Sequence, residues 1–355
     1  MEKVICNCKK ERRLDTLELT MDFSNKNNAE TTLQLRRNSK AISSAINGKL
    51  CYIDSAIHKD YQSAYFCNEY IFQDGNKITS KYCKKRSCLV CSRIMAARLF
   101  KAYSIPLLEL QDLHMVTLTA PTVQAKDLKK EIAKRYDVIF RIKDNLRKIH
   151  GIKIKGFRKV EITYNLKTKE FHPHYHILIE GKQTSELIKN YWLKLIPEAS
   201  EKAQNIKKVK DSGALFEVFK YVTKAIVKDT FDTKALDTMY TSLKGVRTYQ
   251  SFGIKKTQEV KIEKYESLII SHKTERIDVW KWCKDKNDWY TSEGEQMNKG
   301  DVTKETKHSI KVITKHETLK KRDHTKTESE YKINSGFKRP APAKEGSTRN
   351  FFFDG

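Results

Sequence analysis

The decapeptide Phe171-His-Pro-His-Tyr-His-Ile-Leu-Ile-Glu constrains the fold more than any other stretch of this chain. Side chains two apart in a β-strand share a face, so His174 and His176 project together, whereas Tyr175 and the isoleucines that follow it point the other way. Such a strand needs a sheet that buries its aliphatic back and leaves its histidine front open to a ligand. The pattern therefore predicts a strand over 171–180 in a sheet that carries a metal site.

A second alternating segment, 156–164, precedes this strand and is separated from it by a short polar loop. Two alternating segments joined in this way are typical of a β-hairpin. If the hairpin is regular and pairs Tyr164 with Phe171, Glu161 falls opposite His174. We therefore expect a carboxylate beside two imidazoles.

Two imidazoles and a carboxylate suit a divalent cation such as Mn²⁺ or Mg²⁺ that keeps open positions for a substrate. His174, His176 and Glu161 are the expected ligands. His172 shares the parity of the other two histidines and is an alternative ligand, although Pro173 places it at the start of the strand. The competing interpretation is a solvent-exposed patch of histidines that binds no metal.

Four of the eight cysteines lie close together, in the pattern Cys67-x15-Cys83-x4-Cys88-x2-Cys91. Four thiolates complete the tetrahedral shell of a structural zinc and leave no open position for catalysis. The competing interpretation is four ordinary reduced cysteines. Basic residues within and beside the cluster predict a zinc-containing module with a DNA-binding surface: Lys84, Lys85, Arg86 and Arg93.

The charge of the chain points to a polyanionic partner. Its 355 residues include 70 Lys and Arg against 44 Asp and Glu, a formal net charge of +26 at pH 7, and nucleic acid is the first candidate. The apolar runs are far shorter than the roughly 20 residues that cross a bilayer. The first residues lack the apolar stretch of a signal peptide. We therefore expect a soluble intracellular protein with no membrane partner.

The central part of the chain alternates strand-like and helix-like patterns. The order strand, helix, strand, strand, helix, strand is that of a split βαβ, or ferredoxin-like, sheet. The predicted fold is α+β, with a ferredoxin- or RRM-like antiparallel sheet, helices on one of its faces, and the small zinc module in front of it. The elements are strands at 115–119, 156–164, 171–180 and 244–254 and helices at 126–148, 185–195 and 211–229.

Composition divides the rest of the chain. A polar, weakly patterned extension at 1–62 precedes the cysteine module at 63–100 and the sheet domain at 101–256. Tryptophans imply packed structure at 257–300. Residues 301–355 form a basic tail that we expect to be disordered, because 301–350 carries 13 Lys/Arg against 7 Asp/Glu with almost no apolar periodicity.

The helix predicted over 211–229 has two distinct faces. One is apolar, and on the other Glu217, Tyr221 and Lys224 follow one another at about one-turn intervals. A carboxylate, a phenol and an ammonium in this order can act as base, nucleophile and cation in phosphoryl transfer. A solvated face of Glu, Lys and Tyr without chemical function is the common alternative. The metal site predicted on the strand 171–180 favours the chemical interpretation.

Taken together, these elements resemble the rolling-circle replication initiators, or Rep proteins, of small bacterial plasmids. These form the branch of the HUH endonuclease superfamily with a single catalytic tyrosine and an upstream zinc-binding segment. The resemblance covers about 65–256, and Leu89 departs from it, since a proline is expected before the last cysteine. The matching motifs are Cys83-Lys-Lys-Arg-Ser-Cys-Leu-Val-Cys, Met115-Val-Thr-Leu-Thr-Ala-Pro, His174-Tyr-His, Glu217, Tyr221-x-x-Lys224, Leu243-Lys-Gly-Val-Arg and Phe252-Gly-Ile-Lys-Lys.

The resemblance implies a metal-dependent DNA nickase of the bacterial cytoplasm, with 101–256 as its HUH catalytic domain. Tyr221 would attack a phosphate of single-stranded or hairpin-extruded origin DNA and leave a 5′-phosphotyrosine and a 3′-OH primer. Glu217 would activate a water for the second cleavage, and Lys224 would offset charge on the phosphate. Thr117 and Thr119 are implied DNA contacts. A host helicase and the replication machinery are implied partners.

Two other functions stay open at this point. A transposase or mobilisation relaxase would use the same site on different DNA, but relaxases usually place the tyrosine before the histidines, and here Tyr221 follows them. A non-catalytic, zinc-containing DNA-binding protein would act through its basic surface and form no covalent adduct.

Overall fold

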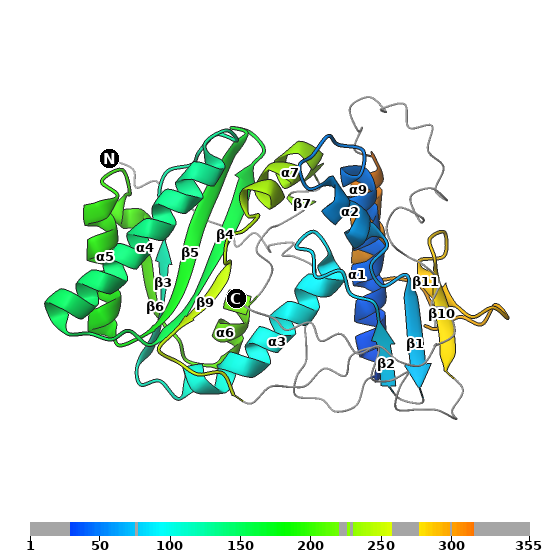
Figure 1. Ribbon diagram of the computed structural model, residues 1–355, viewed down its shortest axis with the longest axis horizontal. Coiled ribbons are helices and arrows are strands. Elements are labelled where there is room, and N and C mark those ends of the chain that lie inside the picture. The colour runs from blue at the N-terminus through cyan, green and yellow to red at the C-terminus, as the bar shows by residue number, and fades with distance from the viewer. Residues whose placement is uncertain are drawn as a thin grey trace, which may run out of the picture. The chain divides into compact units, whose positions relative to one another are not determined.

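The computed structural model describes residues 29–74, 77–219, 226–227, 230–257, 277–298 and 300–315. Within these ranges the chain has the predicted α+β composition. The described strands form a five-stranded sheet, a four-stranded sheet and a two-stranded pair. Helices lie beside both of the larger sheets (Figure 1).

The five-stranded sheet contains the histidine strand. Its order is β6–β3–β5–β4–β9, and all neighbours are antiparallel. The predicted hairpin is confirmed as β4, Gly156–Asn165, and β5, Glu170–Glu180. Its register is also confirmed, because Tyr164 pairs with Phe171 and Glu161 with His174. The other strands are β3 (Leu113–Leu118), β6 (Asn205–Lys208) and β9 (Tyr249–Phe252).

The two edges of this sheet differ from the prediction. β6 was not predicted, because its four residues, Asn-Ile-Lys-Lys, lie mostly exposed beside β3 and carry no clear alternation. It follows the short 3₁₀ helix η1, Glu201–Ala203. The strand expected over 244–254 is the shorter β9, which pairs with β4 at the opposite edge. The sequence pattern therefore located the centre of the sheet but not the order of its edges.

The helix expected over 211–229 is also shorter. In the described residues it is α6, Ser212–Phe219, and β7 (Ile226–Val227) pairs with β8 (Thr230–Phe231) further along. The prediction of a helix up to 229 is therefore wrong, since β-branched residues predominate in this pair and favour strands. Asp232 then begins the unpredicted α7, Thr233–Ser242, by accepting the N–H of Ala235 at 2.9 Å.

Helices cover both faces of the five-stranded sheet, not one as predicted (Figure 1). α4 (Leu128–His150) and α5 (Lys182–Leu195) pack on the face formed by Tyr175 and the isoleucines of β5. α3 (Leu89–Leu108) and α6 pack on the other face against Phe157 and Leu178. The face of the sheet that carries His176 becomes apolar two residues further along β5. This apolar part must be buried too, and α3 and α6 cover it.

Two amino-terminal helices occupy the region that was expected to be a loose extension. They are α1 (Ala29–Leu50) and α2 (His58–Tyr65). Ile46 and Leu50 are fully buried in the same core cluster as α4 and α5. The polar residues that obscure the pattern of α1 are themselves buried, and Asn47 donates to the carbonyl of Ser87 at 3.0 Å. The expectation of a loosely built segment does not hold for these helices.

The four-stranded sheet joins distant parts of the chain. Its order is β11–β10–β1–β2, and β1 (Tyr70–Asp74) and β2 (Lys77–Ser80) precede the last three cysteines of the cluster. β10 (Asp278–Cys283) and β11 (Asp288–Tyr290) come from the tryptophan-containing segment. Trp289 is fully buried and donates to the carbonyl of Asn68 at 2.9 Å. Residues far apart in sequence therefore build the surroundings of the cysteines together.

The start of the expected basic tail is a helix, α9, Lys304–Lys315. Its residue Ile313 is fully buried and belongs to the main core cluster. The prediction of disorder is therefore wrong for α9, where the apolar residues are few but well placed. Residues 316–355 lie outside the described ranges.

A buried ion pair fastens α1 to the carboxyl-terminal strands. Arg37 Nη1 lies 2.9 Å from Asp288 Oδ2, and both side chains are almost completely buried. Asp288 also accepts from Asn298 Nδ2 at 2.7 Å. Each charge therefore has several partners. Removing the guanidinium of Arg37 would leave the carboxylate of Asp288 buried without its compensating charge.

Arg37→Met is accordingly expected to lower the free energy of unfolding by about 3–5 kcal/mol, the usual cost of breaking a buried pair from one side. Thermal or denaturant unfolding measures this change. Lys134→Met is the matched control, because the Lys134–Glu198 pair has a similar 2.8 Å separation but is about half exposed. The control should cost no more than about 1 kcal/mol. Equal costs for the two variants would contradict the structural role of Arg37.

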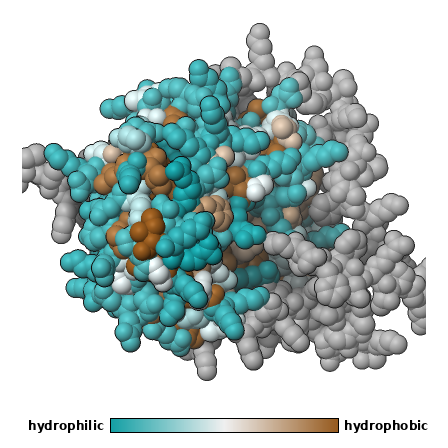
Figure 2. Space-filling model, turned by 60° about the vertical axis from the view of Figure 1, so that its left-hand side comes forward, coloured by the Kyte–Doolittle hydropathy of each residue, from teal (hydrophilic) through white to brown (hydrophobic). Residues whose placement is uncertain are grey.

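The surface is largely polar. In the view of Figure 2, hydrophilic residues predominate and hydrophobic ones form separate patches. Exposed large apolar side chains include Phe140 and Ile149 on α4. Among the described residues, no helix has both the length and the apolar character needed to span a membrane.

Candidate metal centres

Glu161, His174 and His176 meet on one face of the β4–β5 hairpin. The Nε2 atoms of His174 and His176 lie 4.0 and 3.7 Å from the same oxygen, Oε2 of Glu161. The ligand atoms of the three residues all fall within 4.8 Å of one another. All three side chains are partly buried, with exposed fractions of 13–20%. This group can hold a metal ion and leave it accessible from one side.

The second nitrogen of each ring is already engaged. His174 Nδ1 lies 3.2 Å from the carbonyl oxygen of His172, which can only accept, so the ring proton is on Nδ1 and the Nε2 lone pair faces Glu161. His176 Nδ1 lies 3.2 Å from Thr117 Oγ1. Metal-bound histidines usually have such outer contacts. The donor set and the orientation of the rings therefore fit a divalent cation.

The protonation states also fit. Burial lowers the pKa of His174 to about 4, against the opposing attraction of Glu161. Burial disfavours ionisation of Glu161, but the Lys159 ammonium and the two histidines outweigh burial and hold the pKa of Glu161 well below its usual range. At neutral pH the site thus offers a neutral imidazole and an ionised carboxylate, the forms that bind metals.

His172 stacks on His174, with ring centroids 5.3 Å apart, but the metal-ligand group found among the described residues does not include it. Burial lowers the pKa of His172, and the positive charge of Arg135 adds to this effect. His172 therefore serves in this structure mainly through its carbonyl, which orients His174.

Lys159 is a site residue that the sequence pattern did not reveal. It is fully buried, and its Nζ lies 3.1 Å from Glu161 Oε2. In the sheet it lies directly between His176 on β5 and Tyr249 on β9. The predicted hairpin register already placed it opposite His176, but a lysine is normally taken for a solvent-exposed residue.

The two threonines expected to contact DNA have protein partners. Thr117 lies opposite His176 on β3 and contacts its ring nitrogen. Thr119 is mostly buried, and its hydroxyl donates to the carbonyl of Ala203 at 3.3 Å. Thr117 therefore supports a candidate metal ligand, and Thr119 fixes the segment that precedes β6.

Of the three residues predicted on the tyrosine helix, the structure places only the backbone of Glu217, within α6. Tyr221 and Lys224 lie outside the described residues, as does the side chain of Glu217. α6 itself packs on the histidine face of the sheet, because Phe219 meets Phe157 with ring centroids 4.9 Å apart. Phe157 shares its face and strand with Lys159 and Glu161.

The four predicted cysteines form a second cluster. Their sulfurs lie within 4.8 Å of one another, with Cys91 at 3.5 Å from Cys67 and 3.7 Å from Cys83. Hydrogen bonds among the four thiols lower the pKa of Cys88, which accepts them, and raise the pKa of Cys67. This arrangement is a complete four-sulfur set that can hold a metal ion.

Backbone N–H groups surround the sulfurs. Cys83 N–H points to Cys67 Sγ at 3.3 Å, Lys84 N–H to Cys91 Sγ at 3.3 Å, and Lys85 N–H to Cys83 Sγ at 3.4 Å. Lys84 has a positive φ of 58°, which turns the chain tightly enough to aim these groups inward. Because such donors favour thiolates, the loop fits a metal better than four neutral thiols.

The departure at Leu89 has a structural explanation. Leu89 is the first residue of α3, a position that proline suits because its N–H has no partner within the helix. Here the Leu89 N–H donates to Ser43 Oγ of α1 at 3.2 Å. Proline would lose this bond, so leucine at this position fits the packing of α1 against the cysteine module.

The basic residues of the cysteine module are not all at the surface. Arg93 is 8% exposed, and its Nη1 donates to Ser39 Oγ at 2.6 Å, so it connects α3 to α1. The DNA contact predicted for Arg93 stays a prediction. Arg86 donates to the carbonyls of Leu243 and Val246. Lys85 pairs with Asp60 at 2.7 Å. Lys84 is exposed.

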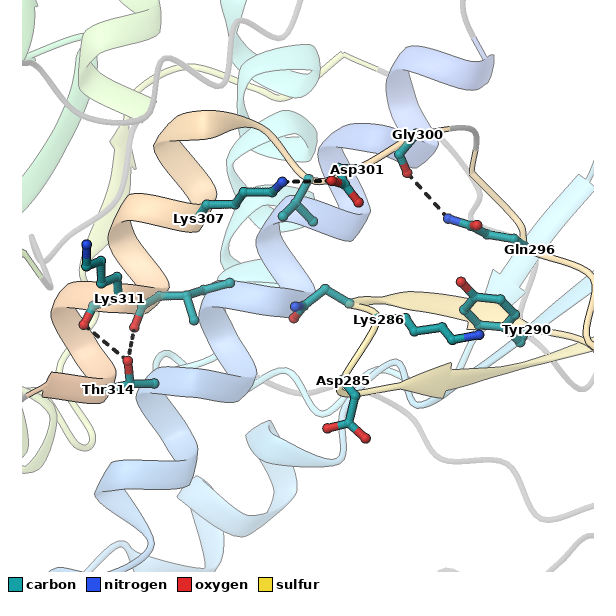
Figure 3. Close-up of a pocket in the computed structure, with 12 residues that line it drawn as sticks. Asp285, Lys286, Tyr290, Gln296, Gly300, Asp301, Lys307, Lys311 and Thr314 are labelled. Atoms are coloured by element: carbon teal, nitrogen blue, oxygen red, sulfur yellow. Dashed lines mark hydrogen bonds and ion pairs between the residues drawn. The ribbon is translucent and has the colours of Figure 1, made fainter.

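A separate pocket of about 690 Å³ lies between the β10–β11 hairpin and α9 (Figure 3). Lys307 in its wall pairs with Asp301 at 2.7 Å, and Lys286 lies over the ring of Tyr290 at 4.7 Å. Neither metal-ligand group lines this pocket. The positive charges of its lysines and the negative charges of its carboxylates largely balance. We therefore assign no function to this pocket and restrict the candidate site to the two clusters.

The fold and the two clusters define an α+β protein whose described residues include one histidine–carboxylate group and one four-cysteine group that can each hold a metal ion. A family model described as "Replication protein" matches residues 76–289, more than half of the chain. The chain therefore belongs to the replication protein family, which confirms the resemblance drawn from its motifs. "Protein rep" of Staphylococcus aureus is 32% identical over 140 residues. That alignment covers 36% of this chain and 60% of the relative. No solved structure matches this chain.

Proposed function

We propose that this protein initiates rolling-circle replication of a plasmid by cutting one strand at the origin through a tyrosine nucleophile, as an HUH endonuclease. One observation carries the proposal: Glu161, His174 and His176 converge on the sheet face against which α6 packs. Membership of the replication protein family supports it. The substrate is origin DNA, single-stranded or extruded as a hairpin.

The packing of α6 supports a role for Tyr221. The described part of α6 ends at Phe219, whose ring lies against Phe157 on the same face as Glu161. Tyr221 is two residues further along the chain. The proposal assigns to its phenol the attack on the scissile phosphate, because Phe219, two residues before it in the chain, packs on this face.

The proposed chemistry balances as a transesterification. The Tyr221 oxygen forms a bond to phosphorus, the bond from phosphorus to the 3′-oxygen breaks, and the 3′-oxygen takes up a proton. The products are a 5′-phosphotyrosine and a 3′-OH primer, which the host polymerase extends while a host helicase unwinds the duplex. Glu217 would serve as base for the water or hydroxyl of the terminating cleavage, and Lys224 would offset phosphate charge.

His174, His176 and Glu161 would hold Mn²⁺ or Mg²⁺, which when bound supplies a Lewis acid at the phosphate. The neutral imidazole of His174 and the Thr117 contact keep the ligands oriented before the cation arrives. Cys67, Cys83, Cys88 and Cys91 would hold a structural Zn²⁺, because four sulfurs leave no open coordination position.

Two alternatives make different predictions. A transposase or relaxase would cut other DNA, and the family match favours the initiator. A non-catalytic DNA-binding protein would form no adduct.

The test uses single-stranded oligonucleotides that tile the DNA flanking the gene, labelled at either end and incubated with Mn²⁺ or Mg²⁺. Label at the 3′ end should follow the protein on a denaturing gel, whereas label at the 5′ end should not. If neither label follows the protein in any tile, the nickase proposal fails.

Residues 318–355, with nine Lys/Arg and five Asp/Glu, are proposed to strengthen non-specific DNA binding. Deleting them should weaken binding and reduce its salt dependence, because each lost phosphate contact removes roughly 0.9 from the slope of log affinity against log salt on duplex DNA. The deletion begins at Thr318, since one that begins at Asp301 would remove the buried Ile313 of α9. Loss of nicking at saturating DNA would contradict an accessory role for this segment.

A further inference from the structure

A short turn between α7 and β9 presents two cationic side chains to solvent. It comprises residues 243–247, and we call it the basic turn. Lys244 and Arg247 are both exposed, and neither forms an ion pair with a carboxylate of the described residues. Gly245 between them has a positive φ of 79°, and the space where a side chain would project is open. The turn therefore leaves room for a negatively charged chain to approach its backbone closely.

Side chains from two other elements hold the basic turn in place. Arg86, in the loop between the cysteines, donates to the carbonyl oxygens of Leu243 and Val246. Tyr136 of α4 donates its hydroxyl to the carbonyl oxygen of Arg247. These three oxygens therefore face the protein and do not repel an anion. Because the turn is already ordered, a ligand that binds it pays little for fixing its conformation.

The surroundings of the basic turn carry positive charge that the described carboxylates do not balance. Arg158 is 1% exposed and lies over the ring of Tyr136, with its guanidinium carbon 3.8 Å from the ring centroid. Its polar partner is the amide oxygen of Gln250, at 2.6 and 2.9 Å, and its Nη1 has no hydrogen-bond partner. Burial lowers the pKa of Arg158, and the nearby charge of Arg247 acts in the same direction. Clustered cations of this kind attract an anion.

The basic turn also adjoins the histidine–carboxylate centre. The N–H of Val160 donates at 3.0 Å to the carbonyl of Thr248, the residue directly after the turn. Val160 precedes Glu161 on β4, and neighbouring strands of a sheet lie only about 4.8 Å apart. β9 is the edge strand here. A DNA strand whose scissile phosphate lies at Glu161 can therefore cross this edge and reach the turn with a nearby phosphate.

We propose that Lys244 and Arg247 bind the phosphodiester backbone of the single-stranded DNA that leaves the cut site across the β9 edge. Contacts to phosphates fix the position of a nucleic acid without reading its bases, so the turn would hold the strand whatever its sequence. The place of the cut rests on the proposed function, whereas binding of the backbone requires no cleavage. Lys244 and Arg247 act as positioning residues.

The first experiment measures binding of the full chain to single-stranded oligothymidylate at several salt concentrations. Lys244→Gln with Arg247→Gln should lower the slope of log affinity against log salt by roughly 1.4, since each phosphate contact on a single strand contributes roughly 0.7. Exchanging the two residues, as Lys244→Arg with Arg247→Lys, should retain the slope. Circular dichroism establishes whether each variant is folded. If the double glutamine variant does not fold, each single variant carries the test, with an expected change of roughly 0.7.

The matched control removes two charges elsewhere on the surface. Lys129→Gln with Lys153→Gln changes two exposed lysines, one in the first turn of α4 and one beyond its last residue. The slope should stay close to that of the wild type. An equal fall in both double variants would assign the effect to net charge and overturn the proposal, as would an unchanged slope in the variant of the basic turn.

The second experiment tests the place of the contact. It uses an oligonucleotide that the wild type cuts, bound to protein carrying Tyr221→Phe so that the DNA stays intact, with one phosphate at a time replaced by an uncharged methylphosphonate. One or two positions close to the cut should weaken binding several-fold. The same positions should have no effect once Lys244 and Arg247 are replaced, because one contact cannot be lost twice. Additive losses at every position would contradict the proposed contact.

The two proposals fail in different ways. If no oligonucleotide from the flanking DNA forms an adduct, the nickase proposal fails, and oligothymidylate still tests the basic turn. If an adduct forms but the basic-turn variant keeps the wild-type slope, the nickase stands and the role of the turn is wrong.

Discussion

Replacing Tyr221 with phenylalanine is expected to abolish both strand cleavage and the covalent adduct, while DNA binding persists. The substitution removes one oxygen, the atom that the proposed mechanism joins to phosphorus. The aromatic ring is retained, so a purely structural role for Tyr221 would leave cleavage nearly unchanged. The readout is a labelled origin oligonucleotide run on a denaturing protein gel.

Glu217→Ala should behave differently, although both residues lie on the same predicted helix face. Without its carboxylate, nicking and the adduct should survive, whereas hydrolytic release should fall by about 10²-fold, the typical contribution of a general base. His174→Ala should resemble Tyr221→Phe, because it removes a ligand from the centre formed with Glu161 and His176.

Tyr249→Phe is the matched control. Tyr249 lies on the same sheet face, opposite Lys159, and its ring is 6.2 Å from that of Phe157. Its hydroxyl has no proposed chemical role, so the adduct should persist. An adduct that forms with Tyr221→Phe and disappears with Tyr249→Phe would move the nucleophile to Tyr249. Tyr240 is a poorer candidate, since it is 4% exposed and packs against Tyr61 in the core on the other face.

Cys88→Ser or Cys91→Ser should remove the bound zinc and unfold the cysteine module. Structural zinc sites contribute roughly 10–16 kcal/mol of binding free energy at pH 7. That exceeds most of the roughly 5–15 kcal/mol by which a whole domain is stable. We therefore expect about one zinc per chain in the wild type, none in either variant, and a large loss of thermal stability or solubility. Metal analysis and thermal unfolding measure these effects.

Cys51→Ser controls for the loss of a thiol as such. Cys51 is partly buried against the core, and burial raises the pKa of its thiol to about 12, so it is a neutral packing residue. This variant should keep its zinc and lose little stability. A well-folded wild-type protein that contains no zinc would remove the four-cysteine centre from consideration.

Local patterns in the sequence were enough to predict both clusters. The hairpin register follows from two alternating strands and one loop, so the alternation alone places Glu161 opposite His174. The cysteines lie within one short segment, and their spacing alone indicates a shared ion. Each inference needed only neighbours in the chain.

Features that depend on distant contacts were not predictable in this way. α1 looks polar in sequence, but residues such as Asn47 are buried, and the side-chain N–H of Asn47 donates to the carbonyl of Ser87 in the interior. Lys159 looks like a surface charge until its pairing with Glu161 is seen. The edge strand β6 has only four residues, mostly exposed, and so carries too little alternation to be predicted as a strand.

The pairing of β1 with β10 has a consequence for how the protein is made. Tyr70 of β1 meets Lys281 of β10, about 210 residues later in the chain. At the usual rate of about 5–20 residues per second, a ribosome needs roughly 10–40 s to synthesise that interval. During this time one edge of β1 has no strand beside it, and open strand edges recruit other chains. The sheet beside the cysteines is therefore completed only after β10 has been made, so a chain that terminates before β10 would present an unfinished sheet to the quality-control proteases of the cell.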